Sequence, residues 1–164
     1  MKRVLISVTV NDQRVEAEIE PRELLLDFLR DRLNLTGAKR SCDVQVCGAC
    51  TVLLDGLPVS ACNMLAYDTN GRHVLTIEGL AQDGELHAIQ KAFIEQNGLQ
   101  CGFCTPGMIL TTKALLAARP DPSESEIRSY LRGNLCRCTG YHPILAAVRA
   151  AAEQMRDGDE RVEI

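Results

Sequence analysis

The chain has 164 residues, of which 46% are apolar and 24% are charged, and its formal net charge is -4. These values are typical of a soluble globular protein with one domain or two small ones. The mild negative charge, without any basic block, argues against nucleic acid or an anionic membrane as the main partner. No apolar stretch approaches the roughly 20 residues that a membrane span requires.

The cysteine content is the unusual part of the composition, since the chain has eight of them. The first ten residues alternate polar and apolar side chains without a small-residue cleavage site, so we expect no signal peptide and a cytoplasmic location. In a reducing compartment, cysteines hold metal or perform redox chemistry more often than they form structural disulfides. The cysteines are therefore the first candidates for function.

The first half of the chain predicts a small mixed sheet crossed by one helix, a ferredoxin-like (β-grasp) shape. Alternating apolar residues on both sides of the polar segment 11–13 predict one hairpin. Asp55–Gly56 between two apolar runs predicts a second hairpin, and Pro58 places its strand at an edge of the sheet. Strands are expected at 3–10, 14–20, 51–54, 57–61 and 74–77, and the helix at 23–33.

The second half predicts four short helices packed as a compact bundle. They are expected at 86–97, at 106–116, from 123 onward and at 143–155. Gly98 is expected to cap the end of the first of these helices, and Ser123 with Glu126 forms the capping-box pattern of the third. The charged residues 156–164 predict a tail that becomes ordered only against a partner. The fold class is thus α+β, with domains at 1–79 and 80–164.

Four cysteines in the first half follow the plant-type ferredoxin pattern for a [2Fe-2S] cluster, C-x4-C-x2-C followed by a fourth cysteine. Three of them share one loop, and the Asp55–Gly56 hairpin returns the fourth to that loop. An oxidised cluster with four thiolates carries a net charge of about -2, so a loop of small residues with inward N–H groups suits it. The predicted ligands are Cys42, Cys47, Cys50 and Cys62.

The second half contains the other four cysteines, in two pairs that each precede a predicted helix. Helix N-termini would then face a bound anion and stabilise it by about 0.3–1 kcal/mol each. Each half therefore has four cysteines with no thiol left over, which favours two four-ligand sites. The second set is Cys101, Cys104, Cys136 and Cys138.

Three other interpretations of the cysteines remain open, although each has a weakness. The two C-x2-C pairs resemble thioredoxin dithiols but lack the βαβ context of that motif. Structural zinc also takes four thiolates, but the isolated Cys42 and Cys62 and the short C-x-C pair do not match a zinc ribbon. A disulfide framework would need an export signal.

Three segments, CDVQVCGACTV at 42–52, QCGFCTPGM at 100–108 and GNLCRCTGY at 133–141, resemble the iron–sulfur subunit of the xanthine oxidase family of molybdenum hydroxylases. Among these, the chain is most similar to the small-subunit type of aerobic carbon monoxide dehydrogenase. The resemblance covers nearly the whole chain, with the motifs in the family's order. It implies an N-terminal β-grasp [2Fe-2S] domain followed by a C-terminal four-helix [2Fe-2S]-binding domain.

The resemblance also implies a role for each cysteine set and for one further residue. The first set would hold an outer cluster toward a flavin, and the second an inner cluster, buried in the helical domain next to a molybdenum–pterin cofactor. Gln100 matches a glutamine that approaches the pterin. The chain would then be an electron-transfer subunit without catalytic residues, relaying single electrons from molybdenum through two [2Fe-2S] clusters to FAD. A large molybdenum subunit and a medium FAD subunit would complete a dimer of heterotrimers.

Two positions depart from the family pattern, because Ser41 and Gln45 stand where many relatives have glycine. Neither removes a ligand, but both affect the loop around the first set. His73, His87 and His142 are scattered along the chain and are interpreted as surface or capping residues. A free-standing two-cluster ferredoxin and a zinc-bound structural adaptor remain the rival functions. The substrate of the holoenzyme, whether carbon monoxide, an aldehyde or an N-heterocycle, is not encoded in this chain.

Overall fold

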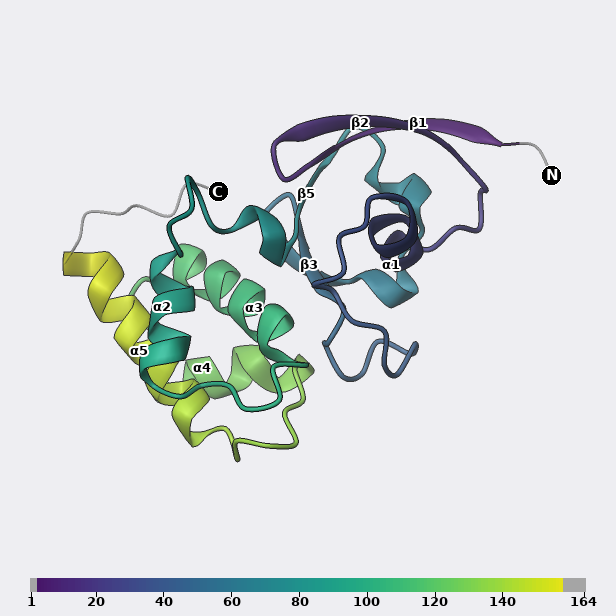
Figure 1. The fold of residues 1–164 in the computed structure, drawn as a ribbon. Helices are drawn as coiled ribbons and strands as arrows, with labels where there is room; N and C mark the ends of the chain where they lie inside the picture. Colours follow the sequence, from purple (N-terminus) through teal and green to yellow (C-terminus); the bar gives the residue numbers. More distant parts are fainter. Residues whose placement is uncertain (1–2, 158–164) are drawn as a thin grey trace.

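The computed structural model describes residues 3–157 as a five-stranded sheet with one short helix, followed by four helices (Figure 1). The strands are β1 (Val4–Val10), β2 (Gln13–Ile19), β3 (Thr51–Leu54), β4 (Leu57–Ser60) and β5 (His73–Leu75). The helices are α1 (Leu25–Asp27), α2 (Ala88–Glu95), α3 (Thr105–Ala118), α4 (Glu124–Tyr130) and α5 (His142–Asp157). The predicted α+β class is confirmed.

The sheet has the order β2-β1-β5-β3-β4, in which β1 and β5 run parallel and all other neighbours are antiparallel. Both predicted hairpins are present. Asn11 and Asp12 at φ 48° and 63°, and Asp55 and Gly56 at φ 48° and 81°, have the positive φ values that two-residue hairpin turns require. The strand β4, which contains Pro58, lies at the edge of the sheet as expected.

The predicted helix at 23–33 begins later and changes its geometry. Residues 25–27 are α-helical, and a π-helical segment, Phe28–Arg32, follows them. The start is displaced because Leu24 forms an isolated bridge with Leu65, and the Leu25 N–H donates to the Met64 carbonyl at 2.8 Å. Pairing with a distant segment thus takes the backbone groups that a first helical turn would use.

The predicted strand at 74–77 ends at Leu75, and the strand at 57–61 ends at Ser60. Thr76 leaves the sheet because its N–H donates to the side-chain oxygen of Asn11 at 2.8 Å, in place of a neighbouring strand. The helix expected at 86–97 is shorter, spanning 88–95.

The cap of α2 also differs from the expectation. Asn97, at φ 54°, is the left-handed residue that follows α2. Gly98 does not have a positive φ but donates its N–H to the Phe93 carbonyl at 2.8 Å. At the start of the same helix, the His87 side chain accepts the N–H of Ile89, which agrees with the capping interpretation of this histidine. The predicted capping box of α4 is confirmed, with Ser123 and Glu126 bonded to each other in both directions.

Each half of the chain has its own apolar core. Ile6, Leu25 and Phe28 belong to the core under the sheet, whereas Phe93 and Ile144 belong to the core among the four helices. Strand β3 and helix α3 join the halves through a small cluster of Leu53, Leu110 and Ala114. The exact boundary after residue 79 stays a prediction. Of the predicted tail, residues 156 and 157 complete α5, and residues 158–164 lie outside the described residues.

Candidate metal centres

The β3–β4 hairpin organises the first thiol set. Thr51 pairs with Ser60 in this hairpin, so Cys50, just before β3, and Cys62, just after β4, come to lie together. Both are buried, at 2% and 4% exposure. The other two members of the set, Cys42 and Cys47, lie on the preceding loop and are half-buried.

Backbone N–H groups of this loop point at the Cys42 sulfur. The amides of Val46 and Cys47 each donate to its Sγ at 3.4 Å. Hydrogen bonds from the backbone of Val44, Cys47 and Val46 lower the pKa of the Cys42 thiol to about 6. This arrangement stabilises a thiolate, which is the form that binds iron.

Gln45 adopts φ 58° within this loop, a left-handed conformation that suits glycine and strains a residue with a side chain. Its side-chain oxygen accepts a hydrogen bond from Asn63 Nδ2 at 2.9 Å. Because Asn63 follows Cys62, the bond ties the loop to the segment that carries the fourth cysteine and offsets part of the strain. Ser41, the other departure from the family pattern, is exposed.

The second thiol set comes from the two loops that precede α3 and α5. The first pair lies just before a helix as predicted, with Cys104 as the N-cap residue of α3, which starts at Thr105 and not at Pro106. Three residues separate Cys138 from the start of α5. The sulfur atoms of Cys101 and Cys138 lie 3.5 Å apart, and Cys104 lies against Cys136. The pair Cys101–Cys104 and the pair Cys136–Cys138, which are far apart in the sequence, therefore lie together.

The thiols of the second set differ in acidity. Burial raises the pKa of Cys104 to about 12, with the neighbouring Cys136 thiol adding to the shift. Burial opposes ionisation of Cys136 too, but hydrogen bonds from Thr139, whose Oγ1 lies 3.1 Å from Cys136 Sγ, lower its pKa overall. Contact with Cys101 raises the pKa of Cys138. A cation that replaces these protons would let all four thiols lie together as thiolates.

The second set is not buried within this chain, which corrects the expectation of an enclosed inner site. Cys101 and Cys138 are exposed, whereas two members of the first set are buried. Phe103 and Leu135, at 45% and 50% exposure, and the exposed Gln100 surround the open side. Among residues 3–157, Cys101 and Cys138 therefore remain open to solvent on this side.

One backbone hydrogen bond joins the two sets directly. The Leu135 N–H, next to Cys136, donates to the carbonyl of Cys47 at 2.9 Å. Beside it, the Asn134 side chain reaches the first-set loop and donates to the Gly48 carbonyl at 3.2 Å. Sequence reasoning missed Asn134, although it is the one uncharged polar residue before the cysteines in the GNLCRC segment and is buried at 4% exposure.

The residues present fit two binuclear clusters. All eight cysteines are free thiols. Two of them, Cys101 and Cys138, lie as a pair, and a [2Fe-2S] cluster takes two ligands on each iron. The buried Thr105 hydroxyl, next to Cys104, has no hydrogen-bond partner among the described residues. A sulfur-rich group held by the second set would supply the acceptor that it lacks.

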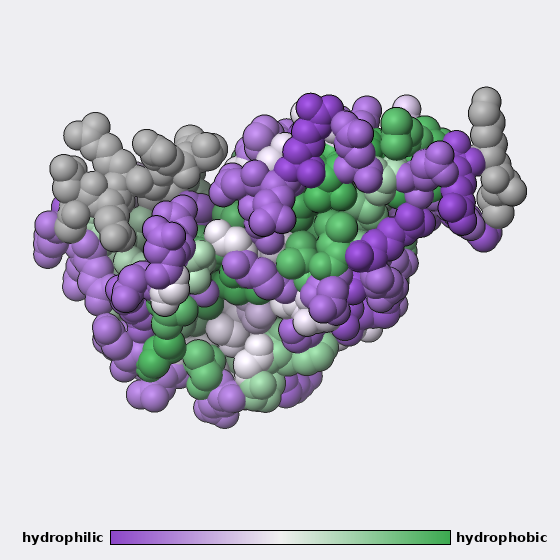
Figure 2. All heavy atoms as spheres, turned by 45° about the horizontal axis from the view of Figure 1, so that its top comes forward, coloured by the Kyte–Doolittle hydropathy of each residue, from purple (hydrophilic) through white to green (hydrophobic). Residues whose placement is uncertain are grey.

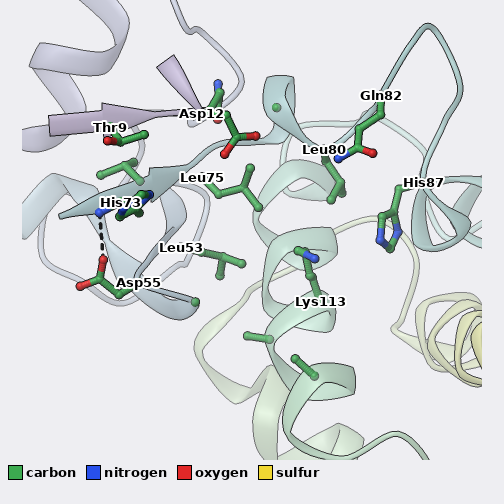
Figure 3. A pocket seen from close by; sticks show the side chains of 16 residues that line it. Thr9, Asp12, Leu53, Asp55, His73, Leu75, Leu80, Gln82, His87 and Lys113 are labelled. Atoms are coloured by element: carbon green, nitrogen blue, oxygen red, sulfur yellow. Dashed lines mark hydrogen bonds between the residues drawn. The ribbon is translucent and has the colours of Figure 1, made fainter. Parts of the chain in front are cut away.

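A cavity lies elsewhere, between the sheet and helix α3. Figure 2 shows hydrophobic side chains in a hollow there, edged by hydrophilic ones. Its volume is about 580 Å³, and Lys113 of α3 points into it across from Leu75 and Leu80 (Figure 3). Burial lowers the pKa of Lys113. None of the residues lining it in the described part of the chain is a cysteine, so the cavity is separate from both thiol sets.

Comparison with known families matches two domain models to the chain, one after the other. Residues 8–74 match the 2Fe-2S iron-sulfur cluster binding domain, and residues 76–149 match the [2Fe-2S] binding domain. All eight cysteines fall inside these two ranges, four in each. The chain therefore binds two [2Fe-2S] clusters. No helix within residues 3–157 is long and apolar enough to cross a membrane.

Full-length relatives are similar over nearly the whole chain. The nicotinate dehydrogenase small FeS subunit of Eubacterium barkeri is 47% identical over 94% of this chain and 98% of its own length. The caffeine dehydrogenase subunit gamma of Pseudomonas sp. (strain CBB1) is 48% identical over 93% of both chains. Among solved structures, quinoline 2-oxidoreductase from Pseudomonas putida 86 contains a chain that superposes with a TM-score of 0.91 at 44% identity, covering 96% of this chain and 99% of that one.

Proposed function

The chain belongs to the family of small iron–sulfur subunits of the molybdenum hydroxylases, and from this premise we propose how it carries electrons between its partner subunits. It is an electron-transfer subunit of an oxidoreductase, with no part in bond breaking. Each [2Fe-2S] cluster supplies a site that accepts and releases one electron at a time. We propose that the electrons come from a molybdenum–pterin cofactor in a large subunit and pass to FAD in a medium subunit.

The eight cysteines are the proposed ligands, four for each cluster. The arrangement of the sulfur atoms supports this assignment. The first set comes from the loop before β3 and the segment after β4, and the second set comes from the loops before α3 and α5. The observation that carries the relay is the hydrogen bond between the Leu135 N–H and the Cys47 carbonyl, which links ligand-bearing segments of both sets at 2.9 Å. A path of backbone bonds and one hydrogen bond between the two proposed clusters suits electron transfer. A purely structural metal role would not require it.

The protein contributes charge compensation and position. Amides of Val46 and Cys47 face the Cys42 sulfur and favour its thiolate form. The N-terminus of α3, which starts just after Cys104, favours negative charge at the second set. The hydroxyl of Thr139 serves Cys136 in the same way. These groups tune each cluster without themselves being ligands.

The exposed side of the second set is the proposed contact with the molybdenum subunit. Cys101, Cys138 and Gln100 are all exposed there, and Phe103 and Leu135 form an apolar rim of the kind that a partner covers. Gln100 is the residue proposed to approach the pterin. The assembly is proposed to be a dimer of heterotrimers in the cytoplasm, where eight free thiols persist without forming disulfides.

An N-heteroaromatic compound is the proposed substrate class of the complex. Relatives named for nicotinate, caffeine and quinoline support it, and relatives named for aldehydes make an aldehyde the second candidate. The choice lies in the large subunit. Anaerobic turnover of the purified complex with both compound classes distinguishes them through bleaching of the cluster absorption.

Purification tests the subunit assignment. We expect the chain to co-purify with two larger chains and to contain about four irons and four labile sulfides, as two [2Fe-2S] clusters require. A brown monomer that purifies alone would indicate a diffusing ferredoxin, and a colourless zinc-containing chain an adaptor. The Gln100→Ala variant should keep its iron but show slower cluster reduction by substrate; an unchanged rate removes Gln100 from the path.

A further inference from the structure

The junction between the two thiol sets is built around one buried amide. Asn134 lies in the turn between α4 and the Cys136 loop and is only 4% exposed. Its Oδ1 accepts the hydroxyl of Thr111 on α3 at 3.0 Å. Its Nδ2 donates to the Gly48 carbonyl at 3.2 Å and lies 3.4 Å from Thr51 Oγ1. One side chain therefore bonds to a helix, to a cysteine loop and to the first residue of β3.

The backbone is tightly packed at two glycines beside this amide. A Cβ added at Gly48 would lie 2.3 Å from the Gly133 carbonyl oxygen, and one added at Gly107 would lie 2.3 Å from the Gly48 carbonyl oxygen. Three segments that are far apart in the sequence thus approach at the Gly48 carbonyl. The loop that carries Cys47 cannot shift against the loop that carries Cys136 unless the bonds of Asn134 break.

We propose that Asn134, held by Thr111, is a positioning residue that fixes the separation of the two clusters and with it the rate of electron transfer between them. This inference rests on the proposed function. In that step, the reduced cluster of the second set loses one electron and the oxidised cluster of the first set gains it, with no bond or proton change in the chain. Asn134 acts through the Leu135 N–H and the Cys47 carbonyl, which it keeps 2.9 Å apart.

Packing alone does not account for an amide at this position. An apolar side chain of similar size could fill the same volume. It would leave the Thr111 hydroxyl without its acceptor and the Gly48 carbonyl without the Asn134 donor, so the Gly48 loop could occupy several nearby positions. A buried polar group whose donors and acceptors are satisfied selects one arrangement, because any shift leaves a desolvated group unpaired. The structural and the positioning roles can be separated by experiment.

The mildest test is Thr111→Val, which removes only the hydroxyl that donates to Asn134. Its matched control is Thr112→Val, because Thr112 is equally buried on the same helix but donates to the Met108 carbonyl within that helix, at 2.8 Å. Both variants are purified in the complete complex with iron counted. There are three readouts. They are the spin–spin splitting between the two reduced clusters in electron paramagnetic resonance, hydrogen exchange of a peptide spanning residues 131–135, and the rate of electron transfer between the clusters after rapid mixing with reductant.

Thr111→Val is expected to change the splitting, to speed exchange of the Leu135 amide and to slow electron transfer between the clusters about tenfold, since small misplacements have large effects on steps that depend on position. Thr112→Val is expected to match the wild type in all three. Asn134→Ala should show the same changes more strongly if it retains its iron, and Thr111→Val decides if it does not.

Unchanged splitting and exchange in fully loaded Thr111→Val overturns the proposal, as does an equal change in Thr112→Val. These results are distinguishable from failure of the proposed function. If the chain held no clusters, or only one, the wild type itself would show no splitting, whereas the positioning role fails when the wild type shows splitting and the variant shows the same.

Discussion

Replacing Gly107 with alanine sets two known effects against each other. Gly107 is the third residue of α3, and alanine is favoured over glycine in a helix by about 1 kcal/mol. The Cβ that alanine adds would lie 2.3 Å from the carbonyl oxygen of Gly48, in the loop that carries Cys47. Local helix propensity therefore predicts a more stable protein, and the tertiary contact predicts a less stable one.

The distances indicate which effect is larger. A comfortable contact needs about 3.5 Å, so the Gly48 carbonyl or the start of α3 would have to move by about 1 Å. Forcing extra atoms into a packed site costs about 1–3 kcal/mol. We therefore expect Gly107→Ala to lower the free energy of unfolding by up to about 2 kcal/mol, because the helix gain offsets about 1 kcal/mol of the strain, and to alter the spectrum of the first cluster through Cys47.

Gly133→Ala provides the matched control. It introduces the same methyl group at the same junction, but no atom lies within 4 Å of the added Cβ, so its stability should stay within about 0.5 kcal/mol of the wild type. Anaerobic urea titration followed by circular dichroism, at equal iron content, measures both. A Gly107→Ala protein more stable than the wild type would refute the tight approach of α3 to the Gly48 loop.

Three further predictions concern the helix cap and the thiols. Ser123→Ala should lower the free energy of unfolding in urea titration by about 0.5–2 kcal/mol, because it removes the N-cap of α4. Bonding to Ser123 lowers the pKa of Glu126, so the difference between variant and wild type should shrink as the pH falls through that lowered pKa. A difference that stays constant with pH contradicts the capping box. In the iron-free chain at pH 7, iodoacetamide should modify Cys42 first and Cys50 among the last, because their pKa values are about 6 and about 12, and mass spectrometry gives the order. Cys138→Ser should lose the second cluster and stop turnover while the first cluster remains, and a full iron count with full activity would remove Cys138 from the ligand set.

Local features of the chain were predictable because their causes lie within a few neighbouring residues. Two-residue hairpin turns require positive φ, and the residue types at Asn11–Asp12 and Asp55–Gly56 adopt it readily, so they predict the two hairpins. The capping pattern at Ser123 places the start of α4. The cysteine spacings predict two four-thiol sets for the same reason, since the ligands of each loop are close in sequence.

Other features of the fold depend on segments that meet only in space. The strand β5 ends where Asn11, 65 positions earlier, accepts the Thr76 N–H, and α1 starts late because Leu24 pairs with Leu65. Hydrophobic periodicity cannot report either event, because both depend on a hydrogen bond to a residue that is distant in the sequence. The C-cap of α2 differs from its prediction by one residue, because Asn97 and not Gly98 adopts the left-handed conformation.

The amino-acid sequence alone indicated the chemistry of this protein, because the spacing of its eight cysteines is typical of [2Fe-2S] ligands and the chain matches two [2Fe-2S] binding domains. Only the tertiary structure decided how the two sets relate. It placed Cys101 and Cys138 on an open side, and it joined the sets through Asn134 and Gly48, which lie 86 positions apart. Ligand identity is a property of single side chains, whereas exposure and separation arise only when distant segments pack together.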